Sequence, residues 1–239
     1  MGISTIKSHF SCHSIFMPRV ARVSVGGMVY HVINRSNGRV QIFDSDAEYR
    51  HFEDLLQEGV DLMGMRILAY CIMPNHWHLV LHPKNDGDLS EFMRWVTTTH
   101  VRQRRAQTET IGHGHLYQGT YKSFPVETDS YLQQLVRYVE QNPVRAKLVA
   151  CAEDWRWSSL WRREKGSVKE KKLLSVLPTE LPEDYLTQVN TLMRQDTLLT
   201  LRVSVNKGTP LGSEKWIDGL VSKFKIGSLL RNPGRPKGR

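Results

Sequence analysis

The alternation of apolar and polar positions predicts strands and helices in a regular order along the first half of the chain. After a Gly-Gly pair, alternating residues predict a strand over residues 27–35. Apolar residues at helical spacing then predict a helix over residues 44–63, capped by Asp44 or Asp46 and ended by Gly64. The first two elements are therefore a strand and a helix.

Two short apolar runs come next, and the residues between them predict a hairpin. Residues 65–72 form one run, and the other run follows Asn75. Pro74 and Asn75 favour a tight turn, so the two strands are expected to pair side by side. A second helix is predicted to begin at Asp88 or Ser90.

A fourth strand, predicted over residues 116–126, completes the order strand, helix, strand, strand, helix, strand. This order is typical of the α+β class and predicts a ferredoxin-like (RRM-like) β-α-β-β-α-β core. A sheet of this kind has one open face, and nucleic-acid-binding modules of the RRM type use that face to bind. The predicted fold is therefore compatible with nucleic-acid binding.

An added helix is predicted over about residues 130–141, behind an Asp-Ser cap. Tyr138 lies on the shoulder of its apolar stripe. Asn142, four residues later, shares that shoulder, and Pro143 directs the chain out of the helix nearby. A tyrosine on such a shoulder ordinarily packs its ring and exposes its hydroxyl to water, so the helix alone assigns no function.

The last third of the chain predicts a mostly helical extension. Residues 165–172 form a charged link, residues 180–194 predict a helix, and a last helix begins after Ser213. The three tryptophans at residues 155–161 cannot share one helical face, so we expect them to pack against the core rather than stack on bases. The tail RNPGRPKGR, with Arg235 and Lys237, resembles minor-groove-binding segments but also suits non-specific attraction.

The charge of the chain narrows its partners. The formal net charge is +9, which favours an anionic partner, most commonly nucleic acid, although membrane surfaces fit as well. No apolar run approaches the roughly eighteen residues of a membrane span, so no membrane association is expected. The three cysteines lack paired spacing, which argues against a disulfide framework or a zinc site and favours a reducing, cytoplasmic location.

Two histidines lie next to each other on the predicted strand after Asn75. Alternate side chains on a strand share a face, so His76 and His78 point one way and Trp77 points the other way. Two imidazoles on one face form half of a metal site that needs an oxygen ligand, although ordinary strand histidines show the same spacing. A second such pair, His113 and His115, lies between glycines and is expected in a loop.

The second helix also carries a group of arginines on or beyond its outer faces. They form either a solvated helix end or a ridge that contacts phosphates, and the charge of the chain favours the ridge. The arginines in question are Arg94, Arg102, Arg104 and Arg105.

Four segments occur in the order of a known family: MPNHWH, QGTYKS, RYVEQNPVRA and DWRWSS. Together they resemble the REP-associated tyrosine transposases, a branch of the HUH single-strand endonucleases with one catalytic tyrosine. The resemblance covers about the first two thirds of the chain and agrees with the ferredoxin-like fold predicted above. One departure is Gly119-Thr120, where relatives carry an arginine before the tyrosine of QGTYKS.

The resemblance implies a mechanism with named residues. Tyr138 takes the position of the nucleophile that forms a 5′-phosphotyrosine intermediate, and His76, His78 and Asn142 take the positions that hold Mg²⁺ or Mn²⁺. Tyr121 is the rival nucleophile, but it lies on a strand in the family pattern and is expected either to pack or to contact DNA. Lys122, the next residue, is a candidate for DNA binding. The implied substrate is single-stranded or hairpin DNA from repetitive extragenic palindromes.

These inferences define the predicted organisation. Residues 1–16 precede an expected translation start at Met17, residues 17–165 form the catalytic domain, residues 166–206 a linker and helical segment, and residues 207–239 a basic helix and tail for accessory DNA binding. A metal-dependent, site-specific single-strand endonuclease is the first hypothesis. The alternative is a host-adopted hairpin-binding protein with little or no cleavage.

The remaining expectations concern partners and location. The sequence has no GxxxxGK[ST] motif, so no nucleotide cofactor is expected. A monomer or homodimer associated with the nucleoid is expected. A small metallohydrolase is less consistent with the sequence, because no carboxylate base lies near the histidines.

Overall fold

The computed structural model describes residues 24–107 and 114–224. Its centre is a four-stranded antiparallel sheet in the order β2-β3-β1-β4. The strands are β1 (Val29–Arg35), β2 (Arg66–Met73), β3 (His76–His82) and β4 (Lys122–Val126). The predicted ferredoxin-like order and the β2–β3 hairpin are confirmed. The predictions for residues 1–16, Met17, His113, Arg235 and Lys237 lie outside the described residues.

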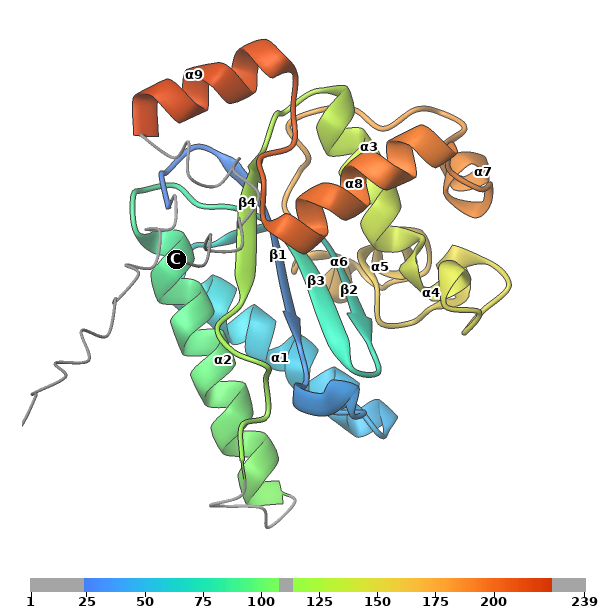
Figure 1. The fold of residues 1–239 in the computed structure, drawn as a ribbon. Helices are drawn as coiled ribbons and strands as arrows, with labels where there is room; N and C mark the ends of the chain where they lie inside the picture. Colours follow the sequence, from blue (N-terminus) through green and yellow to red (C-terminus); the bar gives the residue numbers. More distant parts are fainter. Residues whose placement is uncertain (1–23, 108–113, 225–239) are drawn as a thin grey trace, which may run out of the picture.

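Helices α1 (Asp46–Met63) and α2 (Asp88–Gln107) cover one face of the sheet (Figure 1). Apolar side chains of both helices pack there with alternate residues of the strands, including Trp77. The prediction that Gly64 ends α1 is confirmed, since its φ of 64° suits a residue without a Cβ. The predicted cap of α1 is wrong, because Ser45, rather than Asp44 or Asp46, occupies the N-cap position.

The fourth strand is shorter than predicted. Tyr117 forms an isolated bridge with Ser36, and the Gln118 amide donates to the Arg35 carbonyl at 3.0 Å. Regular pairing resumes only at Lys122, opposite Ile33. The segment between these two pairings therefore bends away from β1, and this bend opens space beside the sheet.

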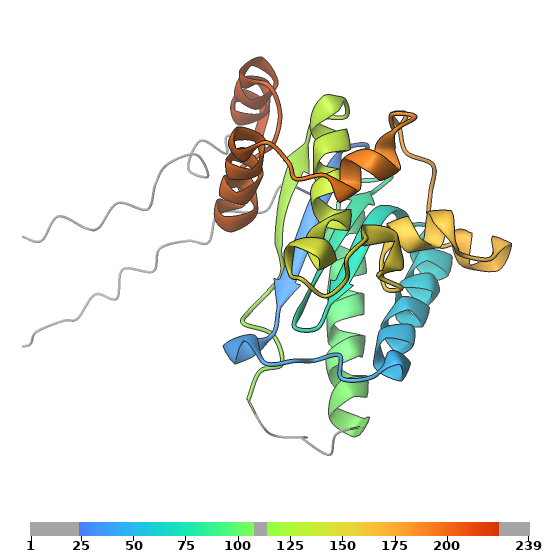
Figure 2. The ribbon, with the colours of Figure 1, turned by 90° about the vertical axis from the view of Figure 1, so that its right-hand side faces the viewer.

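The second face of the sheet is not open, contrary to the prediction. Helix α3 (Ser130–Glu140) packs across it, and α8 (Gln195–Lys207) lies beside α3 (Figure 1 and Figure 2). The apolar stripe predicted for α3 is buried against strand residues such as Leu68 and Val80. Asp129 caps α3 by accepting a hydrogen bond from the Tyr131 amide at 2.8 Å, as predicted.

The C-terminal half contains more helices than the sequence pattern predicts. The predicted link at residues 165–172 contains α6 (Val168–Lys171), which a Ser167–Glu170 capping box begins. The helix predicted over residues 180–194 is confined to α7 (Tyr185–Asn190), and α8 was not predicted. The other elements are a 3₁₀ turn at Asn37–Arg39, α4 (Asn142–Arg145), a 3₁₀ turn at Ala152–Asp154, α5 (Ser159–Glu164) and α9 (Glu214–Phe224).

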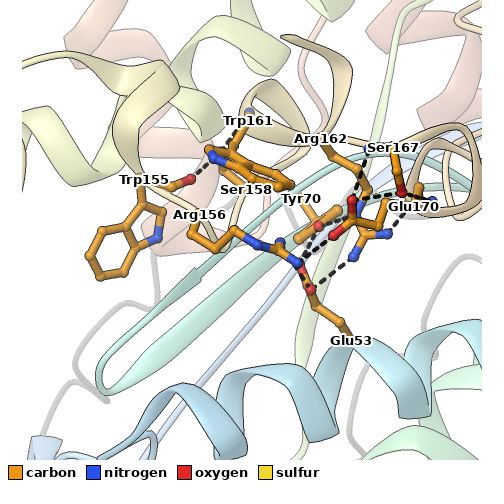
Figure 3. A network of polar contacts seen from close by, with 9 residues as sticks. All are labelled: Glu53, Tyr70, Trp155, Arg156, Ser158, Trp161, Arg162, Ser167 and Glu170. Atoms are coloured by element: carbon orange, nitrogen blue, oxygen red, sulfur yellow. Dashed lines mark hydrogen bonds and ion pairs between the residues drawn. The ribbon is translucent and has the colours of Figure 1, made fainter. Parts of the chain in front are cut away.

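A polar network attaches the tryptophan-rich segment to the core (Figure 3). The buried Glu53 carboxylate on α1 accepts from the Tyr70 hydroxyl at 2.5 Å and pairs with Arg162 at 2.8 Å. Arg156 bridges Glu53 and Glu170. These contacts connect α1, β2 and the segment that carries α5 and α6.

The expected packing of the tryptophans is confirmed. Trp157 stacks on Tyr49 of α1 with ring centroids 4.9 Å apart, and Trp155 donates from Nε1 to the Ile72 carbonyl at 2.9 Å. Trp161 lies against the Arg156 guanidinium at 3.9 Å. Within the described part of the chain, no helix combines the length and the apolar character needed to cross a bilayer.

Candidate functional site

A pocket of about 460 Å³ lies where the bend before β4 opens the edge of β1 and β3. Strands β1 and β3, helices α3, α4 and α8, and the bend itself all contribute side chains to it. Its polar and charged lining residues are Asn34, Arg35, His76, His78, Gln118, Thr120, Lys122, Tyr138, Asn142, Arg202 and Asn206. The four residues that the sequence assigns to chemistry therefore line one pocket.

His76 and His78 project from β3 into this pocket, as the strand alternation predicts. Their ring centroids are 5.1 Å apart. Trp77, between them, points to the opposite face and donates from Nε1 to the Tyr117 hydroxyl at 2.9 Å. The predicted division of the three side chains between the two faces is confirmed.

The hydrogen bonds of Asn75 determine which ring nitrogen of His76 has a free lone pair. The Asn75 side-chain amide donates to the Arg39 carbonyl at 3.0 Å, so its oxygen faces the imidazole. That oxygen lies 2.7 Å from His76 Nδ1 and can only accept, so Nδ1 carries the proton. The lone pair of His76 is therefore on Nε2.

Both imidazoles are held in their neutral forms. Burial, with Arg35 and Arg145 nearby, lowers the pKa of His76 to about 4. Burial, with His31, His76 and the same arginines, lowers the pKa of His78 well below its usual value. Neutral imidazoles have the lone pair that a metal ion requires.

Tyr138 reaches the pocket from α3. Its side chain is 7% exposed, and its ring centroid lies 6.1 Å from that of His78. The Arg145 guanidinium covers the ring, 4.0 Å from its centroid. The boundary position predicted for Tyr138 thus becomes a pocket position once α3 packs on the sheet.

Asn142 lies beside Tyr138 at the start of α4. Helix α3 ends at Glu140, close to Pro143 as predicted, and Pro143 then lies in the first turn of a new short helix, where proline is tolerated. The Asn142 amide nitrogen donates to the Tyr138 carbonyl at 3.2 Å. Its oxygen accepts from Arg145 Nη2 at 2.7 Å. Arg145 therefore holds both the α3–α4 junction and the candidate ligand oxygen.

The donor set suits a divalent ion. Two neutral imidazole nitrogens and one amide oxygen face one pocket, and the oxygen already accommodates the positive charge of a guanidinium. Among the described residues, no group of three His, Cys, Asp or Glu side chains offers another such site. An ion at the Asn142 oxygen would share that oxygen with Arg145 or replace the Arg145 bond.

The structure separates Tyr121 from Tyr138. Tyr121 is 5% exposed and belongs to the apolar cluster under α1 and α2, on the opposite face of the sheet. It does not line the pocket that contains the histidines. Lys122, the next residue, does line that pocket and donates to the Asn206 carbonyl at 3.1 Å. Of these two candidates, only Lys122 reaches the histidine pocket.

The arginines of α2 divide into two groups. Arg104 is 13% exposed and pairs with Asp44 and Glu48, which removes it from the predicted phosphate ridge. The other three arginines line a second pocket of about 850 Å³. His115, an exposed loop residue as predicted, also lines this pocket. This second pocket is lined by Arg94, Arg102 and Arg105.

Several residues in the pocket or directly beside it were not predicted. Arg202 and Asn206 come from α8, whose weak apolar pattern was not recognised as a helix. Arg145 was within reach of sequence reasoning, because it belongs to the RYVEQNPVRA segment. Arg35 and the buried His31 lie on β1, and no local pattern distinguishes them from other strand residues.

Comparison with known proteins identifies relatives of this chain. Residues 24–142 match the family model described as Transposase IS200 like. A Haemophilus influenzae protein, whose name assigns it to the REP-associated tyrosine transposases, is 25% identical over 125 residues, which are 49% of this chain and 71% of that protein.

Two solved structures resemble the chain. A REP-associated tyrosine transposase bound to a REP hairpin superimposes with a TM-score of 0.51 and 20% identity, covering 61% of this chain and 84% of that chain. This likeness shows a common fold. A Deinococcus radiodurans protein named as a transposase has a TM-score of 0.38 and 20% identity, covering 52% of this chain and 96% of that chain.

Proposed function

This chain belongs, over residues 24–142, to the IS200-like transposases, enzymes that act on DNA, and we propose that it cuts single-stranded DNA through Tyr138. The observation that supports this proposal is the convergence of Tyr138, His76, His78 and Asn142 on one pocket. These residues come from α3, β3 and α4, and a protein that only binds DNA has no need to bring them together.

The proposed reaction is an in-line transesterification. The Tyr138 oxygen forms a bond to the scissile phosphorus, the bond from phosphorus to the 3′ oxygen breaks, and the DNA fragment that carries the 5′ phosphate stays attached to the tyrosine. The phenolic proton passes to water, and the released 3′ oxygen takes up a proton from water, so the step releases no net proton. The return step reverses these changes and conserves the energy of the phosphodiester.

We assign His76, His78 and Asn142 to a divalent ion, Mg²⁺ or Mn²⁺. When bound, such an ion offsets the negative charge of the scissile phosphate. The neutral donors leave its full charge available for the phosphate. Arg145 covers the Tyr138 ring and holds the peptide carbonyl of Tyr138 at 2.9 Å, so it orients the nucleophile whether or not Asn142 is released.

Cationic side chains around the pocket suit an approaching DNA strand. Arg35, Lys122 and Arg202 line it together with the histidines. We propose that the substrate is a DNA hairpin with single-stranded flanks, the class to which the REP hairpin of the solved relative belongs. A monomer or homodimer, the nucleoid location and the absence of a nucleotide cofactor stay predictions.

A second candidate function is hairpin binding with little or no cleavage. One observation favours it, because Arg145 bonds the Asn142 oxygen that the ion requires. If the guanidinium keeps that position on DNA, the pocket binds phosphate without assembling the ligand set. The two functions differ in whether a covalent product forms.

The test is to incubate the full chain with hairpin oligonucleotides that carry single-stranded flanks, in Mg²⁺ or Mn²⁺, and to separate the products by denaturing electrophoresis. We expect strand cuts and a covalent protein–DNA band that Tyr138→Phe abolishes and the matched control Tyr121→Phe retains. We also expect chelation and the double variant His76→Ala/His78→Ala to remove the band. Tight binding without an adduct would favour the second function, and an adduct that survives in Tyr138→Phe would refute the assignment of the nucleophile.

A further inference from the structure

A third histidine, His31, lies directly behind the pair on β3. It projects from β1, is fully buried, and does not line the pocket. Its Nε2 lies 2.9 Å from His78 Nδ1, and the two ring centroids are 5.1 Å apart. Phe124 of β4 packs against its other side with ring centroids 4.9 Å apart. His31 is therefore held in a fixed orientation toward His78.

The bond between the two rings has two possible directions, and only one of them suits a ligand. A neutral imidazole carries one proton, so one ring donates and the other accepts. If His31 donates, His78 keeps its own proton on Nε2, and no lone pair is left for the pocket. If His78 donates from Nδ1, its Nε2 lone pair is free, and His31 carries its proton on Nδ1.

The fold by itself does not select the second direction, so a ligand at His78 Nε2 would have to select it. His31 Nδ1 is buried and has no hydrogen-bond partner among the described residues, so the fold itself does not satisfy a proton there. A metal ion bound at His78 Nε2 requires the second direction, in which His78 donates from Nδ1 and His31 carries its proton on Nδ1. The equivalent neighbour of His76 is the Asn75 oxygen, which accepts from Nδ1. Each histidine of the pair thus has a group behind it that can accept its Nδ1 proton.

We infer that His31 is a positioning residue, which accepts the Nδ1 proton of His78 and so directs the Nε2 lone pair of His78 to the metal ion. This inference rests on the proposed function, because it gives the ion one of its two imidazole ligands in the required tautomer. Partners of this kind behind metal-bound histidines fix the ring orientation and raise its basicity. His31 itself touches neither the ion nor the DNA.

Two variants of His31 separate hydrogen bonding from packing. His31→Phe keeps a ring against Phe124 and removes the acceptor, while His31→Gln keeps an acceptor oxygen. The amount of free Mn²⁺, measured by electron paramagnetic resonance during titration of the full chain, gives the affinity. We expect His31→Phe to weaken Mn²⁺ binding about 10- to 100-fold and His31→Gln to restore most of it. Equal affinities for His31→Phe and the parent protein would overturn the inference.

Nitrogen-15 NMR of the histidine rings tests the same inference without Mn²⁺. In the Mg²⁺-loaded parent protein we expect the His78 proton on Nδ1, and a proton on Nε2 would overturn the inference. A parent protein that binds neither ion would refute the proposed metal site. That outcome would also overturn the role of His31 toward the ion, whereas metal binding by the parent protein with equal affinity in His31→Phe would overturn that role alone. Should His31→Phe fail to fold, His31→Gln and the parent spectrum provide the test.

Discussion

Arg202 is the pocket cation whose contribution to DNA binding can be predicted most directly. It is exposed on α8 and lines the pocket with Tyr138 and His76. No hydrogen bond or ion pair holds it among the residues that the structure describes, unlike Lys122, which is bonded to the Asn206 carbonyl. We therefore expect a DNA phosphate to be its first polar partner, and Arg202→Ala removes this cation without breaking a hydrogen bond or ion pair among the described residues.

The magnitude follows from the release of counterions. Each phosphate of single-stranded DNA that a protein neutralises contributes about 0.7 to the slope of log K against log salt. Removing one such contact should lower the magnitude of the slope by about 0.7. At about 0.15 M salt this corresponds to a loss of affinity of about fourfold, or about 0.8 kcal/mol.

The assay is fluorescence anisotropy with a labelled hairpin that carries single-stranded flanks, over a series of salt concentrations. Tyr138→Phe serves as the background, because it prevents cleavage while binding is measured. Arg194→Ala is the matched control, since Arg194 precedes the same helix, is exposed and pairs with Asp196 outside the pocket. Equal slopes for Arg202→Ala and the background would refute the view that α8 contributes to the DNA-binding surface.

Three further predictions concern the stability of the fold. Glu53→Ala should lower the free energy of unfolding in urea by about 3–5 kcal/mol, because it leaves the buried Arg162 charge without its carboxylate partner. The control Glu58→Ala, at an exposed position of the same helix, should change this free energy by less than about 0.5 kcal/mol. Similar losses in the two variants would contradict the role of the network. Gly59→Ala should lower the melting temperature, because a Cβ at this position would lie 2.8 Å from a ring carbon of Phe92 on α2. Gly219→Ala on α9, where no atom lies within 4 Å of the new Cβ, should raise the melting temperature slightly. A rise for both variants would show that α1 and α2 are less closely packed. Burial lowers the pKa of His100 to about 3, so the unfolded chain binds a proton there that the folded chain does not, and stability should fall as the pH decreases from about 6.5 toward 3. His100→Gln should reduce that dependence by up to about 1.4 kcal/mol per pH unit, and an unchanged slope in unfolding measured at several pH values would refute the assignment.

Local patterns were sufficient for most of the core. The strands, α1, α2 and α3 follow from apolar periodicities of two and 3.6 residues, because these depend only on which side chains share a face. The same reasoning placed His76 and His78 together and Tyr138 on the edge of its helix. The predictions failed where the local signal was weak, as in α8, or where pairing with a neighbour stops, as at the start of β4.

The open face of the sheet was a different kind of error. The strand order is correct, but a four-stranded sheet with apolar residues on both faces needs cover on both. The residues on the second face, such as Leu68 and Val80, are as buried as those on the first. The stripe of α3 predicted a buried helix, and only the tertiary structure shows that this helix covers the second face.

The sequence by itself determined the secondary structure of the core, the shared face of the two histidines and the presence of a tyrosine on a helix edge. The tertiary structure decided which of these groups meet. Tyr138 is 60 residues beyond His78 in the sequence, and His31 is 47 residues before it. Contacts over such separations depend on how the helices pack on the sheet, and no periodicity within one segment encodes that packing. The bonds of Arg145 to Asn142 and of His31 to His78 were for this reason visible only in the folded chain.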